Sequence, residues 1–250
     1  AFRYTLRAAT VDPLRRVEGY SYEGSAEIGN VIPFLVDRFL ASPGTVENDV
    51  PFLGRRVIYR PYVRGTIDLR RYAPLSGVTT LATRFFVGAN HPIGDPDVVP
   101  FDRRFYAGGA SSVRGWSLRE LGPGASTLEG AAGDVNLLGG DLKLETSVEL
   151  RATFLRDLAE ADWQLASFVD AGNVWLGPRN PGDDAGRFRA RTFWRQVGVG
   201  SGLGLRLAWE YLIVRFDVAY RLRDPLPSQG GIFADGFGSP TLHFGIGHAF

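Results

Sequence analysis

Long stretches of the chain alternate apolar and polar residues. Residues 2–10 carry apolar side chains at even positions, namely Phe2, Tyr4, Leu6 and Ala8, with arginine and threonine between them. A period of two is typical of a β-strand with one apolar and one polar face. Eight further stretches repeat it, at 20–30, 57–69, 79–89, 142–154, 163–175, 197–209, 211–222 and 241–250. The chain is therefore predicted to be all-β, with about nine antiparallel strands.

The length of these stretches indicates whether their apolar face is covered by a second sheet or by lipid. A soluble sandwich also alternates, but its apolar strand faces are usually shorter than about six residues. Several runs here span about ten residues, enough for a tilted strand to cross a bilayer. Aromatic residues lie near the run ends, as interfacial girdles require: Tyr20, Tyr22, Trp163, Trp175, Trp209, Tyr211, Tyr220 and Phe250. The pattern favours an antiparallel transmembrane β-barrel over a sandwich.

Connections between the runs alternate between short turns and long loops, as in outer-membrane barrels. The stretch VIPFLVDRFL, residues 31–40, has the apolar spacing of a short helix lying in an external loop. The loop over 90–140 is far longer than a hairpin connection, and loops of that length in a compact domain are commonly functional. We expect it on the external side and folded into the lumen.

Composition excludes some classes of protein. A formal net charge of +1 argues against nucleic-acid binding. A mean hydropathy of −0.06 without a run of about 18 apolar residues argues against transmembrane helices. The chain contains no cysteine, which fits passage through an oxidising compartment without disulfides. It contains no methionine and begins within a strand pattern, so we expect a processed or excised piece forming one barrel domain over 1–250.

The centre of the long loop reads Val113-Arg114-Gly115-Trp116. Strand phase places Glu149 and Asp170 on the polar, inward side of two neighbouring strands. A guanidinium held between two carboxylates gains bidentate, charge-assisted bonds that lysine cannot match. One hypothesis is a lock between this loop and the lumen wall; the alternative is that the two acids line a wet channel.

A second inward-facing feature is a row of glycines in the run 197–209, comprising Gly198, Gly200, Gly202 and Gly204. The spacing lacks G-x-G-x-x-G and no helix follows, so a nucleotide site is excluded. Bare strand glycines permit close approach of another backbone, which an inserted loop would supply. The alternative is that they only allow the barrel wall to curve.

Signatures of enzymes are missing. The sequence has no G-x-S-x-G elbow and no phosphate-binding loop, and its three histidines lack metal-ligand companions. His243 and His248 are predicted on opposite faces of the last strand. A glycosidase-like role for Glu149 and Asp170 lacks a substrate cleft. We expect no catalytic residues, no metal and no cofactor.

The last run, 241–250, places one set of side chains on a common side and ends at an aromatic residue: Leu242, Phe244, Ile246, His248 and Phe250. Such an ending resembles the terminal signal by which bacterial outer-membrane barrels are recognised for assembly. We expect localisation in the bacterial outer membrane.

Three segments together resemble a known family: FDRRFYAGGASSVRGW at 101–116, ETSVELR at 145–151 and SFVDAGNVW at 167–175. In this order before an aromatic terminus they look like the C-terminal barrel half of the BamA/TamA superfamily of outer-membrane insertases. The resemblance implies a sixteen-stranded barrel of which this chain supplies the last nine strands, with POTRA domains absent from the chain. It also implies that the Val113–Trp116 tip lies in the lumen, with Arg114 contacting Glu149 and Asp170.

The function implied is assembly or insertion of outer-membrane β-barrel proteins through a lateral seam at the terminal strand, without cofactor. The partners implied are outer-membrane lipids, client barrel polypeptides, and a missing N-terminal half or separate chain that completes the barrel. Two alternatives stay open: a related polypeptide-secretion pore, and a structural barrel subunit of a larger complex.

Overall fold

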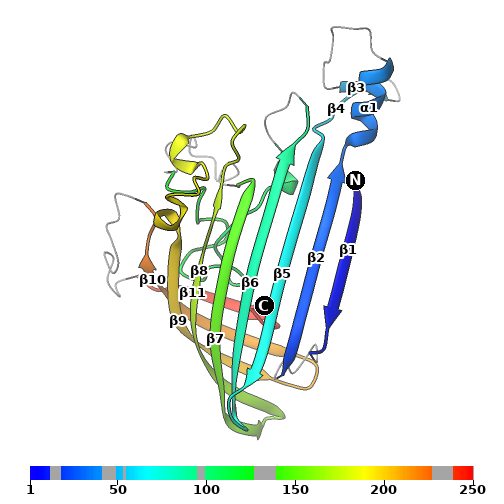
Figure 1. The fold of residues 1–250 in the computed structure, drawn as a ribbon. Coiled ribbons are helices and arrows are strands. Elements are labelled where there is room, and N and C mark those ends of the chain that lie inside the picture. The colour runs from blue at the N-terminus through cyan, green and yellow to red at the C-terminus, as the bar shows by residue number, and fades with distance from the viewer. Residues whose placement is uncertain are drawn as a thin grey trace.

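The computed structural model describes residues 1–11, 18–40, 49–52, 55–94, 99–126, 139–226 and 239–249. Its main feature is one antiparallel sheet of nine strands, ordered β1-β2-β5-β6-β7-β8-β9-β10-β11 (Figure 1). The strands are β1 (Phe2–Ala9), β2 (Gly19–Gly29), β5 (Tyr62–Pro74), β6 (Thr79–Pro92), β7 (Leu142–Leu158), β8 (Ala161–Trp175), β9 (Gly198–Ala208), β10 (Ile213–Arg223) and β11 (Thr241–Ile246). The predicted all-β antiparallel class and the strand number are confirmed.

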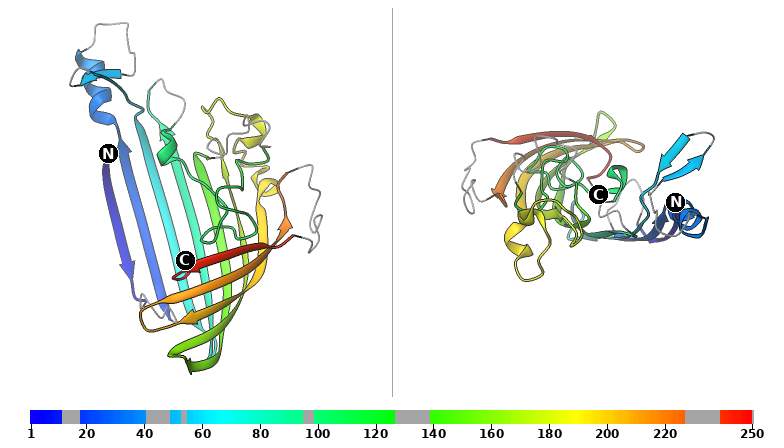
Figure 2. Two further views of the ribbon diagram at one scale, coloured as in Figure 1. Left: turned by 180° about the vertical axis from the view of Figure 1, so that it is seen from behind. Right: turned by 90° about the horizontal axis from the view of Figure 1, so that it is seen from above.

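The sheet curls into part of a barrel and does not close. Each strand pairs with its neighbours along the sheet, and β1 and β11 form the two edges. Figure 2 shows the strands after β7 swinging across the concave side, so that the sheet encloses a partly surrounded space. The wall is therefore a sector of a barrel with two free edges among the described residues.

The predicted helix is confirmed as α1 (Val31–Leu40), which follows β2 at one end of the sheet. The described residues also contain single turns of 3-10 helix at Phe101–Arg103, Asp184–Gly186 and Phe193–Gln196. No helix in this part of the chain is long and apolar enough to cross a membrane.

The run predicted at 57–69 was wrong in its extent. The structure divides it between β4 (Arg55–Ile58), which pairs with β3 (Asp49–Phe52) in a separate two-stranded sheet, and β5, which begins at Tyr62. Pro61 lies between them and has no N–H to give a ladder, so the strand pattern breaks there. Tyr59, which belongs to the predicted run but to neither strand, is buried.

The last strand is also shorter than predicted. It ends at Ile246, because Gly247 adopts a φ of +84° and turns the chain away from the ladder. His248, expected on the outward side, instead lies on the concave side with its Nδ1 3.1 Å from a guanidinium nitrogen of Arg151. Phe250 lies outside the described residues.

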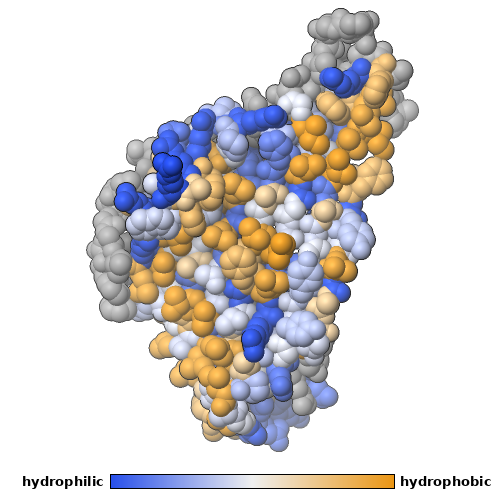
Figure 3. Space-filling model, in the orientation of Figure 1, coloured by the Kyte–Doolittle hydropathy of each residue, from blue (hydrophilic) through white to orange (hydrophobic). Residues whose placement is uncertain are grey.

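The two faces of the sheet are chemically opposite. The outward face exposes large apolar side chains, including those of Val63, Ile67, Leu69, Phe85, Val148, Leu165, Leu203, Phe216, Leu242 and Phe244. Figure 3 shows such residues gathered over the outer surface of the wall. The concave face buries charged ones, including Asp68, Glu145, Glu149, Asp170, Arg206, Arg215 and Asp217. An apolar exterior with a charged interior is typical of outer-membrane barrels.

Part of the long loop fills the concave side. Residues 99–126 cross the enclosed space in Figure 2, and the loop is closed by bridges between Phe105 and Gly140 and between Ala107 and Leu121. Its apolar side chains form a buried cluster with one residue of β8: Phe105, Ala107, Val113, Trp116, Leu121 and Val174. The loop is thus packed against the wall by its own small core.

Candidate functional site

The tip of the loop is a compact turn whose glycines are needed for its shape. Gly108 and Gly109 have φ values of +95° and +104°, and the Gly109 N–H donates to the Trp116 carbonyl at 2.9 Å. A Cβ added at Gly108 would lie 2.4 Å from the Ser117 carbonyl oxygen, so no larger residue fits there. This closure turns Val113, Arg114 and Trp116 toward the wall, where each is at most 2% exposed.

Arg114 is held by two carboxylates. Its Nε and one terminal nitrogen donate to both oxygens of Asp170 at 2.7 and 2.9 Å. Its other terminal nitrogen donates to Glu149 at 2.6 Å, and its backbone N–H donates to Asp170 at 3.2 Å. The structure therefore brings together the three residues whose association was hypothesised. The guanidinium also lies 3.4 Å from the centroid of the ring of Phe168, a residue of β8.

The contact belongs to a larger buried network that sequence reasoning missed. Glu149 also accepts from Arg151 at 2.8 Å and from Arg206 at 3.1 Å. Arg206 in turn donates to Asp217, which also accepts from Arg215 at 2.7 Å. Four arginines thus share three carboxylates across β7, β8, β9 and β10.

Strand parity could have placed Arg206 and Asp217 on the inward face. Arg206 has the parity of the glycine row, and Asp217 lies opposite Gly204 in the β9–β10 register. Parity does not show that the Arg206 side chain reaches across to Glu149 on β7, because that depends on the curvature of the wall.

Electrostatics keep Arg114 charged despite its burial. Burial by itself lowers the pKa of a guanidinium, but Asp170 first, and then the other two carboxylates, outweigh it and raise the pKa of Arg114 above its ordinary value. A buried charge is tolerated only when paired and hydrogen-bonded, and every terminal nitrogen of this side chain has a carboxylate partner.

The glycine row of β9 meets two different environments. A Cβ at Gly200 would lie 2.8 Å from the Gly115 nitrogen, and one at Gly198 would lie 2.9 Å from Trp116 and Leu121 side-chain atoms. At these two positions the loop occupies the space that a side chain would need. Gly202 instead faces the Val218 carbonyl oxygen of β10 and the Phe168 ring, and Gly204 faces Asp217 and Arg206, so these two glycines make room for the wall itself.

The terminal strand also contacts the loop tip. Leu242, Phe244 and Ile246 point outward and are 61–73% exposed. On the inward side, His243 Nε2 lies 2.7 Å from the Arg114 carbonyl oxygen, and the Thr241 hydroxyl donates to the Gly115 carbonyl at 3.1 Å. Arg221 on β10 donates to the same Gly115 carbonyl at 3.0 Å. Neither His243 nor Thr241 was singled out for this contact from the sequence.

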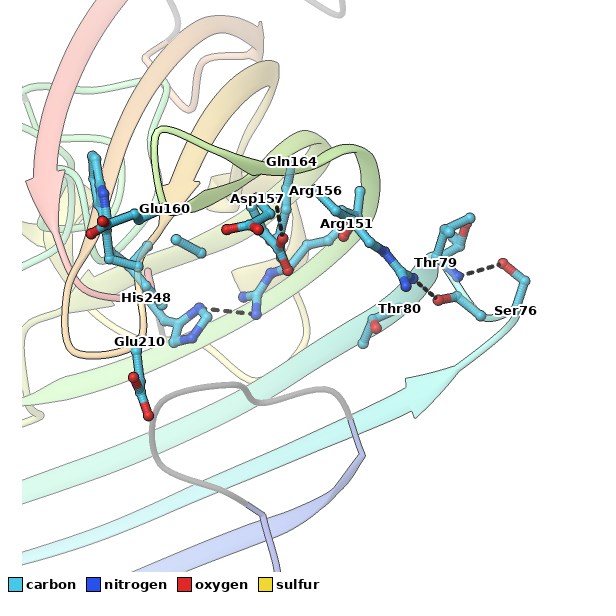
Figure 4. A pocket seen from close by; sticks show the side chains of 17 residues that line it. Ser76, Thr79, Thr80, Arg151, Arg156, Asp157, Glu160, Gln164, Glu210 and His248 are labelled. Atoms are coloured by element: carbon cyan, nitrogen blue, oxygen red, sulfur yellow. Dashed lines mark hydrogen bonds between the residues drawn. The ribbon is translucent and has the colours of Figure 1, made fainter.

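A cavity of about 490 Å³ lies where the β5–β6 and β7–β8 turns meet the end of the chain. Figure 4 shows its polar lining, with His248 directed at Arg151 and with Asp157, Glu160 and Glu210 around them. Acidic and basic groups are mixed, and the described residues contain no cluster of three or more side chains suited to hold a metal ion.

Comparison with known proteins decides the family. The model of the Omp85 superfamily domain matches residues 44–250, most of the chain. The chain belongs to the Omp85 superfamily. Over 116 residues, 46% of its length, this Omp85 chain is 33% identical to the outer membrane protein assembly factor BamA of Neisseria meningitidis serogroup B, of which it spans 14%.

A solved BamA structure agrees with the fold. BamA from Haemophilus ducreyi lacking POTRA domains 1–3 superposes with a TM-score of 0.52 at 17% identity, over 98% of this chain and 52% of that one. CdiB from Acinetobacter baumannii gives a TM-score of 0.39 at 14% identity, over 98% and 41%, too distant to bear on the argument. The Omp85 chain therefore spans about half of the similar solved BamA chain and a smaller part of the curated one. The predicted resemblance to the BamA/TamA superfamily is confirmed.

Proposed function

We propose that this Omp85 chain forms part of a bacterial outer-membrane factor that inserts or assembles client β-barrel polypeptides. The observation that carries the proposal is the Arg114 tip, buried on Glu149 and Asp170 inside a sheet with an apolar exterior. A loop anchored by a fully paired cation is a fixed part of the lumen, so it can hold the wall strands in one arrangement. Membership of the Omp85 superfamily and similarity to an assembly factor support the same function.

The step we propose needs no cofactor. The edge strand β11 presents main-chain donors and acceptors on the side away from β10, and a client strand can pair with them. Because backbone hydrogen bonds do not depend on the client's side chains, one edge can serve many clients. Its outward residues Leu242, Phe244 and Ile246 are apolar and exposed, which supports a position of this edge beside lipid, where the client strand must finish.

The test is client insertion by reconstituted protein. The full protein containing this chain, carrying the substitution Arg114→Ala, is reconstituted in lipid vesicles. The rate at which an unfolded outer-membrane barrel added to the vesicles becomes protease-resistant is then measured. The matched control is Arg119→Ala, which removes an exposed arginine of the same loop that stacks on Tyr106 at 4.4 Å. We expect insertion to fall at least tenfold with Arg114→Ala and to stay near wild type with Arg119→Ala.

Folding of each variant is followed separately, by the shift in gel mobility between heated and unheated samples. A folded Arg114→Ala protein that inserts clients at the wild-type rate would remove the loop contact from the mechanism. Ion conductance with translocation of a polypeptide, in place of insertion, would show the secretion-pore alternative to be correct.

A further inference from the structure

The main-chain carbonyls of the loop tip point toward the terminal strand. The Arg114 carbonyl faces His243 Nε2 at 2.7 Å, and the Gly115 carbonyl accepts from the Thr241 hydroxyl at 3.1 Å. A carbonyl oxygen only accepts hydrogen bonds, so His243 carries a hydrogen on Nε2. Both donors have the inward parity of β11, while Leu242 between them and Phe244 after them face outward.

Arg114 therefore joins elements from both sides of the lumen. Its side chain binds Glu149 of β7 and Asp170 of β8, while its carbonyl binds His243 of β11. The guanidinium contacts fix the position of the tip, and the tip then offers two acceptors at a fixed place in front of the last strand.

The last strand depends on such contacts more than its neighbours do. Six residue pairs join β11 to β10, whereas ten join β10 to β9. An edge strand with a short ladder opens easily, since each ladder bond contributes little net free energy. Two additional hydrogen bonds from inward side chains are therefore a substantial share of what holds β11 in place.

We propose that His243 and Thr241 are positioning residues that latch the terminal strand to the loop tip and so set the seam edge at which a client pairs. The latch deepens the insertion function proposed above and rests on it. A strand held in register presents an ordered row of backbone groups. A strand that opens must be ordered again at each client encounter, which slows pairing.

Isosteric variants separate the latch from general packing. Thr241→Val removes the hydroxyl at constant shape, and Thr241→Ser retains it. His243→Leu removes the donor, and His243→Gln retains an amide N–H at a reach similar to Nε2. The full protein in lipid nanodiscs is followed by amide hydrogen exchange over residues 241–246, with β1 as the reference because it is the other edge strand of the sheet.

We expect exchange in 241–246 to speed up about fivefold for each donor removed. The serine and glutamine variants should stay near wild type, and β1 should be unchanged in all four. Client insertion in vesicles should slow severalfold in the valine and leucine variants and recover in the serine and glutamine ones.

Unchanged exchange in the valine and leucine variants, or an equal rise in β1, would overturn the latch. Faster exchange with an unaltered insertion rate would overturn its role in insertion. If the wild-type protein inserts no client at all, the proposed function fails, and the exchange measurement still decides whether the latch exists.

Discussion

At the scale of single residues, the site depends on the geometry of arginine. The guanidinium of Arg114 uses three nitrogens on two carboxylates from different strands, an arrangement that a lysine ammonium cannot reproduce. Removing one partner of such a buried pair leaves an uncompensated charge, which costs far more than the pair contributes on balance.

Asp170→Ala should therefore destabilise the folded protein by about 3–5 kcal/mol, because it removes the carboxylate that accepts most of the hydrogen bonds of the buried Arg114. Urea unfolding of the full protein in lipid measures the change. Asp162→Ala, on the same strand but near the turn, should change the free energy of unfolding by less than about 0.5 kcal/mol. Equal effects of the two substitutions would contradict the assignment of Asp170.

Glu120 makes the loop's docking sensitive to acid. Burial by itself raises the pKa of Glu120, but the hydrogen bond from the Ser117 N–H at 2.7 Å and the contact with Arg221 outweigh it and lower the pKa. The stabilisation is thus present above the ordinary value of 4.5 and is lost as pH falls through the lowered folded value. Protease cleavage of the loop should accelerate below pH 4.5 in wild type and depend less on pH in Glu120→Gln.

At the scale of elements, strand parity predicted most of what the structure shows. It identified the nine strands and the inward direction of Glu149 and Asp170, because a period of two assigns each residue to a face without knowledge of the fold. It could not show that Arg206 reaches Glu149 two strands away, or that His243 meets the loop. These contacts depend on curvature and on where the tip of a long loop comes to rest.

The close approach of β9 to the loop gives a prediction of its own. Gly200→Ala would place a Cβ 2.8 Å from the Gly115 nitrogen, so the tip must withdraw. We expect an arginine-specific protease to cleave after Arg114 at least tenfold faster in this variant. Gly65→Ala is the control, since its Cβ would meet only the Ser25 carbonyl oxygen, at 3.9 Å. Wild-type cleavage in Gly200→Ala would favour the view that the glycines serve curvature alone.

At the scale of the whole molecule, the described residues form a curved wall with two free edges, an apolar outside and a loop packed within. The sequence predicted the alternation of faces and the length of the loop, but not that Gly247 would turn the chain end inward or that Pro61 would divide a run. Both departures come from the backbone of one residue: the positive φ of Gly247 and the missing N–H of Pro61. A pattern of side-chain polarity carries no information about either.

The most direct test of the central claim is the accessibility of the loop tip in the intact protein. The chain has no cysteine, so a thiol introduced at one position is the only one within these 250 residues, and the protein without it measures any background. Val113 is 1% exposed and Leu118, five residues along the same loop, is 77% exposed. A bulky membrane-impermeant maleimide should label the Leu118→Cys variant rapidly. It should label the Val113→Cys variant only when Arg114→Ala is present as a second substitution or when the protein is unfolded in urea. Equal rapid labelling of both positions in the folded protein would contradict a tip held against Glu149 and Asp170.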